Sequence, residues 1–184
     1  MAVKLVKPIN HKKVVKITNQ DFEAKMRELR VNSDIAVAVS GGPDSLALMH
    51  LSNRYALNNN INLTILSIDH GIRAESSKEI VWLEKIAKKN KINFYSTKLK
   101  KKINSSNTLS KARTLRYEAL SKYCNKKKIK FLLTAHHLDD EIENFLMRLI
   151  RGSGIKGLSS LKVKSRYKNT KLILVRPLLE YSKK

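Results

Sequence analysis

The strongest indication of the fold is a short apolar run that leads directly into a glycine loop. Residues 35–39 read Ile-Ala-Val-Ala-Val, which is typical of a strand buried on both faces of a sheet. The next six residues read Ser-Gly-Gly-Pro-Asp-Ser, and a helical pattern follows from Leu46 to Leu57. A buried strand, a glycine turn and a helix in this order predict a unit of a parallel sheet.

The alternation of strand and helix continues along the chain. Further strands are predicted over residues 63–68, 92–97 and 129–134. Helices are predicted from a capping box at residue 18 to about residue 31, from a cap at residues 76–79, over 108–125, and from about residue 139 onward. The pattern therefore predicts an α/β fold with a doubly wound, mostly parallel sheet.

The chain carries a large positive charge. It has 38 Lys and Arg and 15 Asp and Glu, which gives a formal charge of +23. Its hydrophobic content of 42% is ordinary for a globular protein. Such a charge attracts polyanions: nucleic acid, nucleotides or acidic membrane surfaces. Biased codon usage is an alternative source of many lysines. The composition excludes a collagen, a disordered tail and a disulfide scaffold.

The cysteine content and the N-terminal residues indicate in which cellular compartment the protein is expected. One cysteine, Cys124, excludes an internal disulfide and favours a reduced compartment. The first residues are charged and interrupted by Pro8, unlike a signal peptide, and no apolar run reaches the length of a membrane span. We therefore expect a cytoplasmic protein with no membrane partner.

Polar clusters follow three predicted strands, at residues 40–45, 69–73 and 135–140. Ligands of open parallel sheets bind beyond the carboxyl ends of the strands, so these clusters should meet at one site. In the first cluster, two glycines allow close approach of an anion, and two hydroxyls and a helix N-terminus face it. This predicts a phosphate or pyrophosphate site. A simple capped turn is the alternative, but Asp44 would repel phosphate unless Mg²⁺ lay between them.

The third cluster contains four acids in five residues, more than helix capping requires. They suit a metal contact or an ammonium substrate, and the absence of a thiolate argues against structural zinc. The helix that follows has an apolar stripe, which predicts packing against the core. The stripe consists of Ile142, Phe145, Leu146, Leu149 and Ile150.

Two arginines and a basic segment are candidates for anion contacts. Arg113 and Arg116 lie one turn apart on one helix and suit phosphate oxygens, with solvated surface arginines as the alternative. Residues 98–130 contain twelve basic residues against Glu118 alone, which favours an RNA-facing surface.

The glycine loop resembles the pyrophosphate loop (PP-loop) of ATP-pyrophosphatases, a superfamily that includes NAD synthetases, asparagine synthetases and tRNA thiolation enzymes. Residues 33–180 as a whole closely resemble the N-terminal domain of the tRNA(Ile)-lysidine synthetase family. The further segments that carry this resemblance occur in one order: Asp69-His70-Gly71-Ile72-Arg73, Ala112-Arg113-Thr114-Leu115-Arg116-Tyr117, Ala135-His136-His137-Leu138-Asp139-Asp140, Arg151-Gly152-Ser153-Gly154 and Arg176-Pro177-Leu178-Leu179.

The resemblance implies a ligase that uses ATP and Mg²⁺. ATP would adenylylate the wobble cytidine of a tRNA(Ile) with a CAU anticodon, releasing pyrophosphate. Free L-lysine would then displace AMP and leave lysidine. The alternatives are a thiolation-type PP-loop enzyme and a non-catalytic basic RNA-binding protein. A second copy of the chain, in a homodimer, is a further candidate partner.

The resemblance also implies roles for individual residues. Asp44, His136, Asp140 and Arg113 would be catalytic, and Asp44 and Asp140 would hold the metal. The ATP-binding residues would be Ser40, Gly41, Gly42, Pro43, Asp44, Ser45, Ile68, Asp69, His70 and Arg116.

The chain departs from the family in two places. The family usually reads Gln-x-Glu-Thr where this chain reads Glu141-Ile142-Glu143-Asn144, so Asn144 receives no role. Members also continue into C-terminal domains beyond the Arg-Pro-Leu-Leu segment. We therefore expect residues 1–32 to be a basic arm with a leading helix, and 33–184 to be the PP-loop catalytic domain without those further domains.

Overall fold

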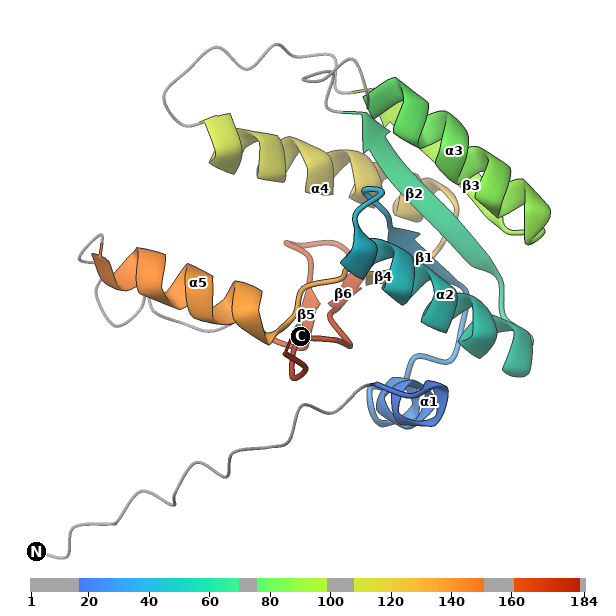
Figure 1. Ribbon diagram of the computed structural model, residues 1–184, viewed down its shortest axis with the longest axis horizontal. Coiled ribbons are helices and arrows are strands. Elements are labelled where there is room, and N and C mark those ends of the chain that lie inside the picture. The colour runs from blue at the N-terminus through green and yellow to red at the C-terminus, as the bar shows by residue number, and fades with distance from the viewer. Residues whose placement is uncertain (1–16, 70–75, 99–107, 151–160, 183–184) are drawn as a thin grey trace, which may run out of the picture.

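The computed structural model describes residues 17–69, 76–98, 108–150 and 161–182 (Figure 1). Helices and strands alternate through most of this length. In chain order the elements are α1 (Asn19–Glu28), β1 (Ile35–Ala38), α2 (Pro43–Asn58), β2 (Leu63–Asp69), α3 (Ser76–Lys89), β3 (Asn93–Lys98), α4 (Thr108–Lys126), β4 (Phe131–Leu133), α5 (Leu138–Ile150), β5 (Lys164–Arg166) and β6 (Ile173–Val175).

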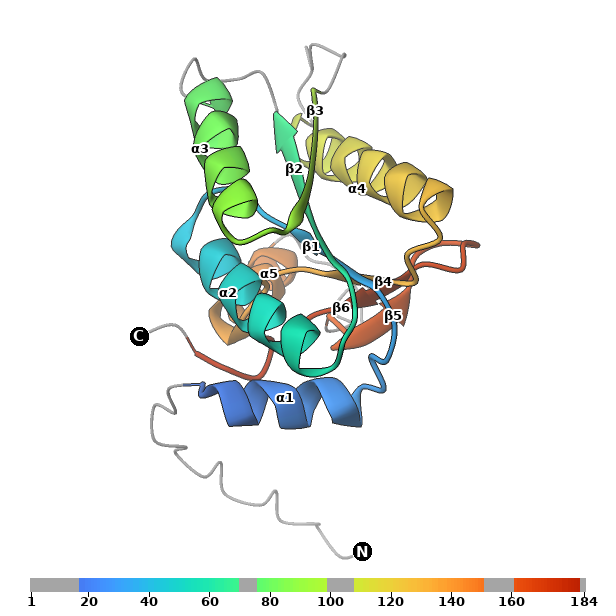
Figure 2. The ribbon, with the colours of Figure 1, turned by 90° about the vertical axis from the view of Figure 1, so that its right-hand side faces the viewer.

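The strands form one six-stranded sheet in the order β3-β2-β1-β4-β6-β5. All neighbouring pairs are parallel except β5 and β6, which are antiparallel. Helices α2 and α3 lie on one side of the sheet and α4 on the other (Figure 2). The predicted doubly wound α/β fold is therefore confirmed. Strands β5 and β6 extend it beyond the elements that the sequence pattern indicated.

Two apolar layers hold the helices to the sheet. Alternate residues of β1 enter different layers, since Val37 packs with Leu48 and Leu83 whereas Ala36 packs with Leu120. A strand buried on both faces needs an uninterrupted apolar sequence, which explains the run at residues 35–39. Helix α1 shares the first layer through Phe22 and Met26.

The predicted capping box is present at the start of α1. Thr18 Oγ1 accepts a hydrogen bond from the Asp21 N–H at 3.1 Å, and the Asp21 carboxylate accepts one from the Thr18 N–H at 3.0 Å. The helix ends at Glu28, earlier than the predicted residue 31. Arg30 takes a left-handed conformation with φ 51°, and the Val31 N–H donates to the Met26 carbonyl. This closing turn brings Val31 into the core.

Helix α2 begins at Pro43, three residues before the predicted start. Proline suits the first turn of a helix because its missing N–H would have had no intrahelical partner there. Asp44 and Ser45 therefore lie in the first turn of α2, and the helix fixes the position of their backbone.

The prediction that the apolar stripe of α5 packs against the core is wrong for the side chains that the structure describes. Ile142, Phe145 and Leu146 are each 44–49% exposed, and Ile150 is 80% exposed. Figure 1 shows α5 extending away from the sheet. Helical periodicity identifies an apolar face, but it does not specify what covers that face. Among the described helices, none is both long and apolar enough to cross a membrane.

Candidate nucleotide-binding site

A pocket opens at the carboxyl ends of β1 and β4 and beside the end of β2. It brings together the first and third of the predicted polar clusters, from the glycine loop and from the residues after β4, and adds one face of α4. Its lining consists of Ala38, Val39, Ser40, Gly42, Asp44, Ser45, Leu66, Ile68, Arg116, Tyr117, Leu120, Thr134, Ala135, His136 and Asp140.

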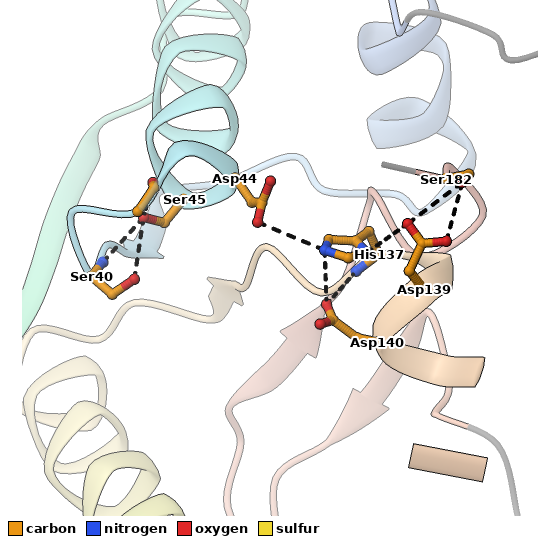
Figure 3. Close-up of polar contacts among 8 residues, drawn as sticks. Ser40, Asp44, Ser45, His137, Asp139, Asp140 and Ser182 are labelled. Atoms are coloured by element: carbon orange, nitrogen blue, oxygen red, sulfur yellow. Dashed lines mark hydrogen bonds and ion pairs between the residues drawn. The ribbon is translucent and has the colours of Figure 1, made fainter. Parts of the chain in front are cut away.

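The glycine loop is closed by the two serines at its ends. Ser45 Oγ donates to the Gly42 carbonyl at 2.8 Å and accepts from the Ser40 N–H at 3.2 Å (Figure 3). Gly41 has φ +85°, a backbone conformation that residues other than glycine rarely adopt. Gly42 is the N-cap of α2 and makes no side-chain cap hydrogen bond, and the N-terminus of α2 with its dipole favours an anion at this loop.

His137 lies between the two carboxylates that the sequence analysis assigns to a metal. Its Nε2 is 3.7 Å from Asp44 Oδ2 and 3.5 Å from Asp140 Oδ2 (Figure 3). The Asp140 carboxylate also accepts a hydrogen bond from the His137 N–H at 2.9 Å, as a helix cap does. Carboxylates from α2 and α5 thus approach one point in space.

His137 was not among the predicted site residues, whereas its neighbour His136 was. The signal was present, since a histidine directly before an acidic helix N-terminus is placed to meet carboxylates. The order of residues does not say which of two adjacent histidines faces Asp44, because that depends on the turn between β4 and α5. On the other side of the ring, His137 Nδ1 lies 3.5 Å from Asp139 Oδ2. The Asp139 carboxylate also accepts a hydrogen bond from Ser182 Oγ.

His136 lines the pocket and is held differently. Its Nδ1 lies 3.0 Å from Thr134 Oγ1. Burial, followed by the positive charges of Arg176 and Arg113, lowers the pKa of His136 to about 4. The imidazole is therefore neutral at neutral pH, with no net charge to oppose a cationic substrate.

Some of the remaining predicted site residues lie at the pocket and others do not. Arg116 and Ile68 line the pocket, and Arg113 lies near enough for its charge to act on His136. Asp69 does not join them: its side chain is 2% exposed and pairs with Lys98 at 3.6 Å, on the α3 side of the sheet beside Ile80. The Asp69 side chain is therefore not placed for the predicted contact with ATP, and only the backbone of this residue is left for it. His70 lies outside the described residues.

The residues at the pocket fit a magnesium ion. No group of three or more His, Cys, Asp or Glu arranged to hold a metal occurs among the residues described. Mg²⁺ does not need one, because it usually binds one or two carboxylates together with water and substrate phosphates. Asp44 and Asp140 provide hard oxygen donors of this kind from two different elements.

The fold and the pocket define an α/β protein with a glycine loop that opens a helix at the edge of a parallel sheet, and comparison with known families agrees. Residues 10–184 match the family described as PP-loop domain, and the chain belongs to that family. The predicted PP-loop is thereby confirmed.

Curated relatives of this chain are tRNA(Ile)-lysidine synthases. The chain is 46% identical over 151 residues to the enzyme of Rickettsia bellii (strain OSU 85-389), which covers 82% of this chain and 34% of the relative. It is 43% identical over 155 residues to that of Wolbachia pipientis wMel, covering 83% of this chain and 35% of the relative. The predicted resemblance is confirmed, and the chain spans about a third of the length of these relatives.

A solved structure has a similar fold. The U34-tRNA thiolase NcsA from Methanococcus maripaludis, with its [4Fe-4S] cluster, superposes with a TM-score of 0.71 at 26% identity. The match covers 86% of this chain and 58% of the thiolase.

Proposed function

We propose that this chain is the catalytic domain of an enzyme that ligates lysine to the wobble cytidine of tRNA(Ile) with a CAU anticodon. The proposal is carried by one observation: the PP-loop, His136, Asp140 and Arg116 line a single pocket in a chain that is 46% identical to a lysidine synthase. We place the domain at residues 33–184, preceded by a basic arm and leading helix. Because tRNA, ATP and lysine meet in the cytoplasm, we place the reaction there.

ATP is the nucleotide in this proposal. Its phosphates would lie at the N-terminus of α2, where the helix dipole favours negative charge. The Arg116 guanidinium faces the same pocket and suits phosphate oxygens. Leu66 and Ile68 provide an apolar wall for the adenine. Asp44 and Asp140 would hold Mg²⁺, which offsets phosphate charge when it is bound.

The reaction would proceed in two steps. In the first, O2 of the cytidine forms a bond to the α-phosphorus of ATP and the bond to pyrophosphate breaks. In the second, the ε-amine of lysine forms a bond to C2 of the cytidine and AMP leaves with O2. Positive charge from Arg113 and Arg116 would offset the charge that develops on the α-phosphate.

The acidic and histidine side chains would serve the lysine substrate. The acidic first turn of α5 would attract the ε-ammonium, which must lose a proton before it can attack. Neutral His136 lines the same pocket and can accept a proton there. Its low pKa makes it a weak base, so its proton acceptance would be transient.

AMP release tests this function. The chain is incubated with ATP, Mg²⁺ and a tRNA(Ile) transcript, with and without lysine. We expect AMP to accumulate only when tRNA and lysine are both present, and a C34U transcript (uridine at the wobble position) to be inactive. A chain that binds the transcript but forms no AMP is the non-catalytic RNA-binding alternative, and this result would overturn the proposal.

Sulfur transfer is the second candidate, because the NcsA thiolase shares this fold. The chain has a single cysteine, whereas an iron–sulfur cluster is held by several thiolates. Cys124 is fully buried on α4, and burial raises the pKa of its thiol to about 12. It is therefore not a nucleophilic thiolate at neutral pH. Cys124→Ser should change AMP formation less than about twofold, since it removes no contact of the pocket.

A further inference from the structure

Helix α3 presents an aromatic and basic stripe on its outer face. Lys78, Val81, Trp82 and Lys85 line a shallow hollow there. Their spacing of three, four and seven residues places them on one face of a helix. The opposite face packs on the sheet through Leu83 and Ala87, which are both fully buried. The residues of the stripe therefore do not contribute to the packing of α3 on the core.

Trp82 is the unusual member of this stripe. It is the single tryptophan of the chain, and it is 46% exposed beside Val81, which is 51% exposed. Large aromatic side chains gain most by burial, so an exposed indole in a groove marks a contact surface. Lys78 and Lys85 line the same hollow from the adjacent turns. Lysine side chains characteristically cover apolar surface with their stems and keep their ammonium groups in water.

The stripe begins close to the glycine loop. Helix α3 follows a parallel strand, so its N-terminus lies at the carboxyl edge of the sheet, where the pocket opens. Glu79, next to Lys78, places its Oε2 3.7 Å from where a Cβ on Gly41 would stand. From this point α3 runs along the sheet on the side opposite α4 (Figure 2). The N-terminal end of α3 and the pocket therefore lie at the same edge of the sheet, with α3 and α4 on opposite sides of it.

We propose that Trp82 and its flanking lysines bind RNA, with an unpaired nucleotide stacked on the indole and its phosphates on Lys78 and Lys85. Charge complementarity favours RNA over a protein partner. Helix α3 carries four lysines and two glutamates, within a chain of charge +23. Stacking on an aromatic ring accepts any base, and the lysines contact phosphate without reading sequence. The inference rests on the proposed function only in taking RNA as the partner.

The single tryptophan allows a direct test. The 184-residue chain is titrated with a tRNA(Ile) transcript and with a single-stranded oligoribonucleotide, and Trp82 emission and RNA anisotropy are recorded together. We expect RNA to quench Trp82 emission along the binding curve. Trp82→Ala should weaken RNA binding about fivefold to a hundredfold, the loss of one stacked base. Trp82→Phe keeps an aromatic face and should stay within about threefold of the parent.

A matched control separates stacking from general loss of apolar surface. Leu57 is 72% exposed near the C-terminal end of α2, the end of that helix away from the glycine loop. Leu57→Ala should leave RNA affinity unchanged. The double variant Lys78→Gln, Lys85→Gln should reduce the slope of log affinity against log salt by about 1.5, because two phosphate contacts are lost. Circular dichroism verifies that each variant is folded.

Three outcomes overturn the inference. In the first, RNA binds the Trp82→Ala chain as tightly as the parent and leaves parent emission unchanged; the proposed function then stands if AMP is still formed. In the second, RNA does not bind at all and no AMP is formed, and the proposed function fails with it. In the third, Trp82→Ala abolishes self-association in sedimentation and leaves RNA affinity unchanged, which would make this face a protein contact.

Discussion

At the scale of single residues, the candidate site depends on which side chains share one point. Asp44 from α2 and Asp140 from α5 both approach His137 Nε2, although 95 residues separate them in sequence. Each carboxylate thus has a partner before any nucleotide binds. If ATP brought a divalent cation to this point, each carboxylate would exchange its contact with the His137 imidazole for a stronger contact with the cation.

Asp44→Asn tests this role. The substitution preserves shape and removes the charge that would hold Mg²⁺, so we expect AMP formation to fall at least about a hundredfold. Thermal unfolding should change little, because a partly exposed helix position contributes within about 0.5 kcal/mol. Glu28→Gln removes one charge at an exposed position of α1 and serves as the control. Near-parental turnover of Asp44→Asn at saturating Mg²⁺ would show that the assignment is wrong.

His136 should make stability depend on pH. Its pKa is about 4 in the folded chain, against 6.5 as its ordinary value. Between these values the unfolded chain binds a proton that the folded chain does not, so stability falls as pH falls from 6.5 to 4. This one group contributes a slope of at most about 1.4 kcal/mol per pH unit.

Urea unfolding at pH 7, 6, 5 and 4 measures this slope. Replacing the imidazole by an amide in His136→Gln removes the titrating group and keeps a partner for Thr134. We expect the free energy of unfolding of the variant to depend less on pH across this window. Parallel pH profiles for the two chains would mean that His136 titrates normally when folded.

At the scale of elements, α5 differs from the other helices. Its first turn belongs to the pocket through Asp140, while its later apolar side chains, Ile142, Phe145 and Leu146, are exposed. The periodicity of this helix is nevertheless that of a helix packed on a core. An amphipathic pattern reports only that one face is apolar.

Phe145 and Phe131 should therefore respond differently to truncation. Phe131 of β4 is 1% exposed, and Phe131→Ala should cost about 3–5 kcal/mol by leaving a cavity. Phe145 is 44% exposed, and Phe145→Ala should cost less than about 1 kcal/mol. Urea denaturation of both variants provides the comparison. A loss above 2 kcal/mol for Phe145→Ala would show that its face is covered in solution.

At the scale of the whole molecule, we expect the charge of +23 to govern the proposed association with RNA. Lysines that contact phosphates release counterions, so affinity depends steeply on salt. Contacts to phosphates carry no sequence information, whereas discrimination requires base contacts or recognition of shape. The chain spans about a third of its curated relatives, so we treat discrimination as a property to be measured on this chain.

Filter binding at two salt concentrations tests this account. We expect tRNA affinity to fall about tenfold to a thousandfold between 50 and 200 mM salt, as several phosphate contacts require. Affinities for tRNA(Ile) and for a non-cognate tRNA should differ by less than about threefold. A strong preference for tRNA(Ile) that persists at high salt would place base recognition within these 184 residues.

Much of the fold could be predicted because its signals are local. The buried run at 35–39, the glycine loop and the capping box at Thr18 each act through neighbours in sequence, and all three occur in the structure. The edge at which the first and third polar clusters meet followed from the parallel direction of the strands, since parallel strands end on the same side. The choice of Ser40, Ser45 and Arg116 as pocket residues rested on such signals.

Tertiary structure decided what sequence neighbours cannot. Whether His136 or His137 meets Asp44, and whether Asp69 faces the pocket or Lys98, depends on the rotation of each strand end relative to elements far away in the chain. The exposure of α5 and of Trp82 depends likewise on what packs beside them. Backbone geometry and apolar periodicity are properties of short segments. The partner of a side chain is a property of the whole packed chain, because it is determined by contacts between distant segments.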